Sequence, residues 1–228
     1  MRGGNIVKVT GPGELAARIV RAADDAGGRR YLVGVAGPPG AGKSTLAQAL
    51  VDAVRRSGVS AEVAGMDGFH LSSALLRDAG ALARKGQPDT FDVASFVARL
   101  RRLRDSAIGV PVPWPVYDRA RHDPVADAVV FTGERVAIVE GNYLLLDRPG
   151  WREVREYLDE VWYLDAEEAV IEQRLLRRHL RGGKSPDRAE AMVAGSDLPN
   201  ARLIARTADR ADLVLRAVSG GYLIRPGR

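Results

Sequence analysis

The fold is decided by the stretch YLVGVAGPPGAGKS, which occupies residues 31–44. Its first six residues form a short, continuous apolar run, as is typical of a buried strand. The next eight, Gly37–Ser44, match the pattern G-x-x-x-x-G-K-[ST] in full. A helical segment, Lys43–Arg56, follows and is closed by Ser57-Gly58. A strand, a glycine-rich turn and a helix in this order predict a loop whose backbone N–H groups surround phosphate groups.

Outward from this loop, segments of strand and helix type alternate along the chain. The strand candidates are Tyr31–Ala36, Ala61–Met66, Arg135–Val139, Glu160–Leu164 and Asp212–Leu215. The helix candidates are Glu14–Ala26, Lys43–Arg56, Asp92–Arg104, the segment from Ala166 to about Leu180, and most of Pro186–Arg210. This alternation predicts the three-layer α/β/α fold of the P-loop NTPases, with a doubly wound, mainly parallel sheet. We expect one domain over residues 1–228, with the proline-containing stretch Gly109–Phe131 as a small β-element.

The composition is that of an ordinary soluble globular protein, with 46% apolar and 28% charged residues in a chain of 228. The chain has no cysteine, which excludes a disulfide framework and a thiolate metal site. Met1–Thr10 has no apolar core of a signal peptide. No run approaches the roughly 18 apolar residues of a membrane helix. We therefore expect a cytoplasmic protein without a membrane partner.

The net charge of +5 has two interpretations. It is either an arginine-rich solvated surface or an attraction to anions such as nucleotides and phosphorylated products. Basic residues cluster locally at Arg99–Arg104 and Arg174–Arg181, and no aromatic residues are interleaved with them. Because a nucleic-acid surface would need such a pattern, we expect no nucleic-acid partner.

The phosphate loop predicts ATP and Mg²⁺ as the cofactors. In such loops the lysine, here Lys43, reaches the β- and γ-phosphates, and the hydroxyl of the following residue, here Ser44, ligates Mg²⁺. The chain contains no guanine-reading N-K-x-D, which argues against a switch GTPase. The residues expected to bind the nucleotide in the loop are Gly37, Pro38, Pro39, Gly40, Ala41, Gly42, Lys43, Ser44 and Thr45.

Further motifs follow the phosphate loop in a fixed order. They are Met66–His70 (MDGFH), Lys85–Asp92 (KGQPDTFD), Pro115–Asp118 (PVYD), Glu140–Tyr143 (EGNY) and the arginine-bearing segment Arg174–Arg181. With this set the chain resembles the P-loop kinase family of uridine kinase, bacterial type I pantothenate kinase and phosphoribulokinase. The likeness spans about residues 31 to 181. It implies an ATP-dependent kinase that phosphorylates a hydroxyl of a small metabolite.

The resemblance implies roles for two carboxylates. Asp67 matches the family aspartate beside the acceptor hydroxyl and is expected to be the general base, since phosphoryl transfer needs a group that accepts the hydroxyl proton. The alternative for Asp67 is a helix cap. Glu140, expected just after the strand Arg135–Val139, is placed like a Walker-B acid that holds Mg²⁺ or touches the substrate. Its alternative is a surface salt bridge. Asp92 is expected only to cap the helix that follows it.

The acceptor site is predicted from the same motifs. Tyr117 and His122 have the five-residue spacing of a tyrosine and a histidine that face the acceptor in uridine kinase. The alternatives are a packed Tyr117 and an exposed loop His122, and packing is the expectation for Trp114. The Lys85-Gly86 pair resembles pantothenate kinase more than uridine kinase, which has an aspartate at the position of Gly86. The full set of expected substrate contacts is Asp67, His70, Lys85, Tyr117, His122, Glu140, Asn142 and Arg181.

A lid is expected at about residues 174–195. Arg174, Arg177 and Arg181 share a helix face at i, i+3 and i+7, and Arg178 lies close to that face. The resemblance implies that these arginines meet the triphosphate, with Arg177 catalytic and Arg174 and Arg178 on the nucleotide, because a guanidinium grips phosphate oxygens well. A solvated basic face is the alternative. Gly182-Gly183 is a candidate hinge.

Two alternative functions and the oligomeric state stay open. One is a nucleotide-binding regulatory ATPase without a small-molecule acceptor, and the other is a basic nucleic-acid-binding ATPase. Nothing in the sequence forces an oligomer, although a homodimer is compatible with the resemblance. The segment Asn142-Tyr143 departs from the uridine-kinase and pantothenate-kinase patterns and indicates another branch of the family.

Overall fold

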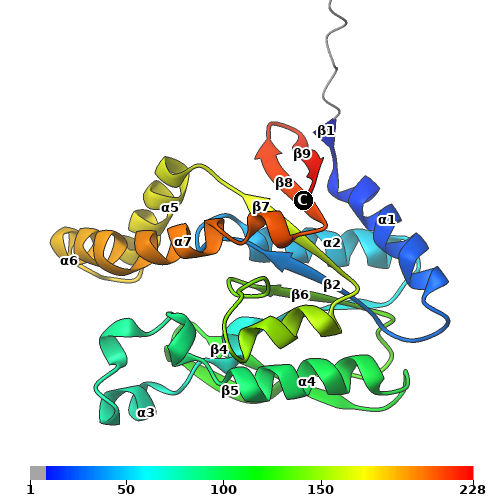
Figure 1. The fold of residues 1–228 in the computed structure, drawn as a ribbon, viewed down its shortest axis with the longest axis horizontal. Helices are drawn as coiled ribbons and strands as arrows, with labels where there is room; N and C mark the ends of the chain where they lie inside the picture. The colour runs from blue at the N-terminus through cyan, green and yellow to red at the C-terminus, as the bar shows by residue number, and fades with distance from the viewer. Residues whose placement is uncertain (1–8, 228) are drawn as a thin grey trace, which may run out of the picture.

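The protein is described here by a computed structural model that covers residues 9–227. The first eight residues, which carry most of the expectation about a signal peptide, lie outside the described part, as does residue 228. Within residues 9–227, no helix is both long and apolar enough to cross a membrane. The described chain folds around one large sheet, with helices on both of its faces (Figure 1).

The large sheet has seven strands in the order β1-β9-β8-β7-β2-β6-β3. The strands are β1 (Val9–Thr10), β2 (Tyr31–Ala36), β3 (Ala61–Gly65), β6 (Val136–Gly141), β7 (Glu160–Asp165), β8 (Leu213–Val218) and β9 (Gly221–Pro226). From β8 to β3 every neighbouring pair is parallel, whereas β9 and β1 add an antiparallel edge. The predicted mainly parallel sheet is confirmed, and β2, the strand before the phosphate loop, is the central one of its five parallel strands.

The two faces of the sheet are covered differently. Successive side chains of a strand point to opposite faces, so Val33 and Val35 of β2 pack with helices α1 (Pro12–Asp25) and α2 (Lys43–Arg56). Leu32 and Ala36 pack in the opposite core. That core is formed with α4 (Val93–Asp105), the 3₁₀-helix η4 (Trp151–Tyr157) and the hairpin of β4 (Val112–Asp118) and β5 (Asp123–Phe131). Figure 1 shows these layers on the two sides of the sheet.

The hairpin is the small β-element expected at Gly109–Phe131. Its two strands form a separate antiparallel sheet. Trp114 packs as predicted: its side chain is fully buried, and its ring nitrogen donates to the carbonyl of Gly65 at the end of β3. The hairpin is thereby fastened beside the carboxyl ends of the parallel strands, where ligands bind in sheets of this type.

The expected lid forms a helical arm with its own small core. It consists of α5 (Glu168–Arg181), α6 (Pro186–Met192), the π-helical turn η5 (Val193–Asp197) and α7 (Leu198–Ala205), which lie together at the left in Figure 1. Ile171, Leu175 and Val193 form a separate apolar cluster with Leu198 and Ala201. That these helices move as a lid stays a prediction.

Several element boundaries differ from the sequence expectations. Strand β6 continues to Gly141, so Glu140 lies inside the strand and not after it. The edge strands β1 and β9 were not predicted. Short helices were also missed: α3 (Ser73–Asp78) and the 3₁₀-helices η1 (Met66–Phe69), η2 (Leu82–Arg84), η3 (Pro88–Thr90) and η4. The cap of α4 is confirmed, because the Asp92 side chain accepts from the Ser95 N–H at 3.0 Å.

Candidate active site

The phosphate loop connects β2 to α2 in a conformation that only glycine adopts easily. Gly37 has φ +149° and Gly42 has φ +105°, in the region that disfavours side chains. A Cβ added to Gly37 would lie 2.6 Å from the carbonyl oxygen of Leu164. The loop is therefore shaped by close backbone packing on β7. It leads into the N-terminus of α2, whose exposed N–H groups favour an anion.

Lys43 is held inside this loop. Its side chain is almost fully buried, and its ammonium donates to the carbonyl oxygen of Pro38 at 3.0 Å and to Oδ1 of Asn142 at 2.7 Å. An ammonium has three N–H donors, so one remains for a phosphate oxygen. Burial lowers the pKa of Lys43, while the charges of Glu140 and Asp67 oppose that shift. Asn142, expected to contact the substrate, thus contacts the lysine of the loop.

Ser44 and Glu140 form the candidate metal site. The Ser44 hydroxyl, in the first turn of α2, donates to Oε1 of Glu140 in β6 at 3.3 Å. Both groups offer the hard oxygen ligands that Mg²⁺ prefers, so the donor set fits this ion. No group of three or more His, Cys, Asp or Glu side chains in the described residues could hold a metal. Mg²⁺ commonly takes its other ligands from phosphate and water, which agrees with a site of this size.

Glu140 and Asp67 face each other across the same end of the sheet. Gly65 of β3 pairs with Glu140 of β6, and Asp67 follows two residues later in η1. Burial and the charge of Asp67 raise the pKa of Glu140, whereas Lys43 and the Ser44 hydrogen bond lower it. The two carboxylates and the buried ammonium therefore form one electrostatic unit.

The Asp67 carboxylate is held by no hydrogen bond to any described residue. The cap position of η1 is Gly65, so the helix-capping alternative for Asp67 is wrong. Its closest cationic group is Arg119 of the hairpin turn, with 3.9 Å between Nη2 and Oδ2. The Asp67 side chain is 35% exposed. A partly exposed carboxylate without hydrogen bonds is free to accept a proton from a bound hydroxyl.

His70 is fixed beneath the hairpin. Its Nδ1 lies 2.8 Å from the carbonyl oxygen of Asp67, which accepts, so Nδ1 carries the proton and Nε2 is left as an acceptor. Its ring packs against Phe91 and Tyr117 at centroid distances of 4.0 and 4.8 Å. Burial lowers the pKa of His70, and the charge and backbone carbonyl of Asp67 oppose this shift with smaller effects. The lowered pKa favours the neutral ring.

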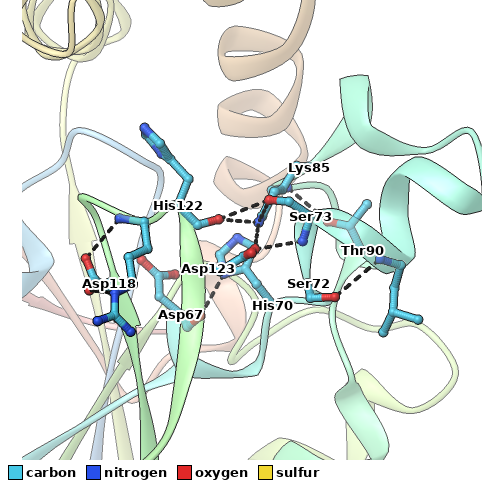
Figure 2. Close-up of polar contacts among 12 residues, drawn as sticks. Asp67, His70, Ser72, Ser73, Lys85, Thr90, Asp118, His122 and Asp123 are labelled. Carbon is cyan, nitrogen blue, oxygen red and sulfur yellow. Dashed lines mark hydrogen bonds and ion pairs between the residues drawn. The ribbon is translucent and has the colours of Figure 1, made fainter.

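Lys85 is engaged by protein groups. Figure 2 shows its ammonium between Ser73 of α3 and the turn of the β4–β5 hairpin. It donates to Oγ of Ser73 and Oδ1 of Asp123, each at 2.8 Å, and to the carbonyl oxygen of His122. It also lies 5.4 Å from the centre of the Tyr117 ring. Lys85 was expected to contact substrate, but these contacts use all three of its N–H groups.

Tyr117 and His122 differ in how they are placed. The Tyr117 side chain is half-buried, and its hydroxyl donates to no described residue, so it remains available to a ligand. His122 is exposed and has a positive φ of 55°. Figure 2 shows its backbone carbonyl aimed at Lys85 and its ring pointing away from Asp123. The structure therefore brings Tyr117, but not the His122 ring, next to His70 and Asp67.

The four lid arginines are not equivalent. Arg174 donates to the carbonyl oxygens of Gly40 and Ala41 in the phosphate loop, both at 3.0 Å. Arg178 lies near Asp197, at 3.9 Å, and its charge lowers the pKa of Lys43. Arg177 and Arg181 are exposed and contact no acidic group among residues 9–227. The arm thus places Arg174 on the loop and Arg178 toward the site.

Sequence reasoning missed Arg119 and the partners of Lys85. Arg119 directly follows the recognised motif Pro115–Asp118, but its approach to Asp67 depends on how the hairpin folds back on η1. Asp123 and Ser73 are 38 and 12 residues from Lys85 in the sequence. A signal was present in the turn YDRARHD, whose density of charge is high for a hairpin connection.

A family model described as "Phosphoribulokinase / Uridine kinase family" matches residues 32–221. Among curated proteins, the chain is 35% identical over 195 residues to the uncharacterized protein YggC of Escherichia coli strain K12, covering 85% of this chain and 80% of the relative. It is 30% identical over 216 residues to a pantothenate kinase of Limosilactobacillus reuteri, covering 83% and 69%.

A solved structure shows the same fold. A protein from Silicibacter sp. TM1040, proposed in its description to be a fructose transport system kinase, superimposes with a TM-score of 0.83 and 40% identity. The match covers 90% of this chain and 98% of that one.

Proposed function

The chain belongs to the phosphoribulokinase and uridine kinase family, and we propose that it transfers the γ-phosphoryl group of ATP to a hydroxyl of a small metabolite. One observation carries this proposal. The unbonded carboxylate of Asp67 lies beside Glu140, in the same charged unit as Lys43 of the phosphate loop. A proton acceptor next to a phosphate-binding lysine and a metal carboxylate is the arrangement that phosphoryl transfer to a hydroxyl requires.

On the donor side, the loop from Gly37 to Ser44 holds the phosphates of the nucleotide. The free N–H of Lys43 binds a phosphate oxygen, while Pro38 and Asn142 keep its ammonium in place. Ser44 and Glu140 would hold Mg²⁺. When bound, the ion would neutralise charge on the phosphates of the nucleotide. Thr45 is expected to extend the contacts of the loop.

On the acceptor side, Asp67 accepts the proton of the attacking hydroxyl. A bond forms between the acceptor oxygen and the γ-phosphorus, the bond from that phosphorus to the ADP oxygen breaks, and the proton passes to Asp67. The Tyr117 hydroxyl and Nε2 of His70 line the approach. Lys85 holds the surrounding segments and does not touch the acceptor.

The helical arm is proposed to close over the triphosphate. Arg178 already lies close enough for its charge to act on Lys43. Arg177 and Arg181 are exposed and without an acidic partner in the described chain, so both are free to meet phosphate oxygens when the arm moves. Gly183, with φ +82°, remains the proposed hinge.

The Asp67→Asn variant tests the role of the carboxylate. Turnover should fall by about 100- to 10,000-fold, the range that a general base contributes, while the affinity for Mg-ATP stays within about twofold. Both are measured by ADP release and calorimetry. Asp78→Asn, an exposed aspartate at the end of α3, is the matched control and should keep full activity. Near-normal turnover of Asp67→Asn would remove Asp67 from the reaction.

The acceptor is sought with a panel of nucleosides, vitamins, and free and phosphorylated sugars. Relatives named for pantothenate and for fructose transport suggest that vitamins and sugars come first. One compound that raises ADP release and gains the mass of a phosphoryl group would identify the substrate. Acceptor-independent ATP hydrolysis with every compound would favour the regulatory ATPase. A cytoplasmic location, a homodimer and the lack of nucleic-acid and membrane partners stay predictions.

A further inference from the structure

Arg119 is a cation beside the catalytic carboxylate that no protein group binds closely. Its side chain is 66% exposed, and its ion pair with Asp67, at 3.9 Å, is too long for a hydrogen bond. It donates to no other residue among 9–227. A guanidinium has five N–H donors in a fixed fork, and here all of them face solvent or the site.

The neighbouring charged side chains of the same turn already have protein partners. Asp118 accepts from the N–H groups of Ala120 and Arg121, and its carboxylate lies 3.4 Å from the Arg121 guanidinium. Asp123 accepts from Lys85 and from the N–H of Ser73. These charges therefore stabilise the turn itself, whereas Arg119 is left for another partner.

The turn that carries Arg119 is fastened in place. Lys85 binds it through Asp123 and the His122 carbonyl, with the lysine side chain only 14% exposed (Figure 2). These contacts hold the pKa of Asp123 near 2, because Lys85 and then Ser73 stabilise its charged form. The Tyr117 ring lies 4.8 Å from the His70 ring and 5.4 Å from the Lys85 ammonium. The backbone of the turn is thus preorganised next to Asp67.

We propose that Arg119 binds an anionic group of the acceptor, so the substrate is a small hydroxyl metabolite that carries a carboxylate or a phosphate. This inference rests on the proposed kinase function. Arg119 comes from the hairpin on the acceptor side, whereas the nucleotide phosphates have Lys43 and the arm arginines. Two oxygens of a carboxylate or phosphate on the acceptor can each accept a hydrogen bond from the planar guanidinium, which gives a bidentate contact.

The same contact sets how the acceptor lies. In the absence of substrate, Arg119 faces Asp67. An anion on the acceptor draws the guanidinium to itself, and its hydroxyl is left to meet the carboxylate of Asp67. The guanidinium of Arg119 and the carboxylate of Asp67 are neighbours, so one small acceptor can meet both with its anionic group and its hydroxyl. An uncharged acceptor gains nothing from Arg119.

The test uses matched pairs of compounds: glycerate with glycerol, pantothenate with pantothenyl alcohol, and fructose 6-phosphate with fructose. The wild-type protein should prefer the anionic member of the pair it phosphorylates by about 10- to 100-fold in kcat/KM, as expected for a charge-assisted hydrogen bond. The first two pairs report a carboxylate and the third a phosphate. Arg119→Gln should abolish the preference, mainly through the KM of the anionic member.

Arg121→Gln is the control, because this arginine lies in the same turn and is paired with Asp118. It should keep the wild-type preference. An unchanged preference in Arg119→Gln would overturn the inference. So would an equal fall of kcat for both members of a pair, since Arg119 would then act on the transferred phosphoryl group.

If none of the six compounds is phosphorylated, that result counts against the kinase proposal and not against the role of Arg119. Binding is then measured instead. The same six compounds are titrated calorimetrically in the presence of Mg²⁺ and a non-hydrolysable ATP analogue. Tighter binding of an anionic member, lost in Arg119→Gln and kept in Arg121→Gln, would support the inference. Binding of no anionic member by the wild-type protein would overturn it.

Discussion

At Glu140, Mg²⁺ binding requires the charged carboxylate, whereas the stability of the ligand-free fold favours the neutral carboxyl group. The carboxylate is half-buried beside Asp67, and both its desolvation and that charge raise its pKa. A carboxyl group whose pKa is raised on folding stabilises the native state below its ordinary pKa and loses that contribution as pH rises through the raised value. At neutral pH the ligand-free protein therefore carries a destabilising charge, which Mg²⁺ neutralises when it binds.

Glu140→Gln should increase the free energy of unfolding of the ligand-free protein at pH 8, because the buried charge is removed and the amide still reaches Ser44. The gain over wild type should shrink as the pH is lowered below 4.5, where the wild-type carboxyl becomes protonated in the unfolded state as well as in the folded state. Urea denaturation across this pH range measures it. The same variant should lose Mg²⁺-dependent ATP binding.

Glu153→Gln, an exposed glutamate on η4, is the control and should follow the wild-type pH dependence. A Glu140→Gln protein that is less stable than wild type at pH 8 would show that the contacts with Ser44 and Lys43 outweigh the burial of the charge.

At the scale of elements, the site depends on the close contact between η1 and β4. A Cβ on Gly68 would lie 2.1 Å from the carbonyl oxygen of Pro115. This backbone contact joins the turn that carries Asp67 to the strand that carries Tyr117. The hydrogen bond from Trp114 to Gly65 closes the same interface from its buried side.

Gly68→Ala should separate η1 from β4. The expected destabilisation is about 1–3 kcal/mol, typical of overpacking a tight site, and turnover should fall because Asp67 moves relative to the acceptor residues. Unfolding in urea and ADP release measure the two effects. Gly133→Ala, where an added Cβ meets open space, should change neither. Equal behaviour of the two variants would mean that the contact is dispensable.

At the scale of the whole molecule, the ligand connects the loop, the sheet and the arm. Ligand that binds only the folded protein stabilises it by about 2.7 kcal/mol at 100 times its Kd. For a domain of this size, about 2–4 °C in Tm accompanies each kcal/mol. Mg-ATP at that concentration should therefore raise Tm by roughly 5–10 °C.

The shift should disappear when EDTA removes the metal, and Lys43→Met should abolish it by removing the N–H that binds phosphate. Differential scanning fluorimetry measures both. Lys184→Met, half-buried after the arm's glycine pair, is the control and should keep most of the shift. A full shift in Lys43→Met would contradict the assigned role of the loop lysine.

The strand–loop–helix unit was predicted to the residue, because its signals are local. Tyr31–Ala36 and Lys43–Arg56 have the predicted bounds. The strand β9 escaped prediction because its pairing with β8 and β1 is antiparallel at the edge of an otherwise parallel sheet, and its residues are only half-buried. The weak hydrophobic pattern of β9 can be recognised as a strand only once its pairing with β8 and β1 is known.

The sequence by itself determined the family, the parallel sheet and the phosphate loop, since motif spacing and hydrophobic periodicity are properties of neighbouring residues. Only the tertiary structure decided that Lys85 fastens a turn and that Arg119 faces Asp67. These contacts join residues 37 or more positions apart through the packing of the hairpin against η1. A long-range contact between charged side chains leaves no periodic trace in the sequence, so it becomes visible only when the chain is folded.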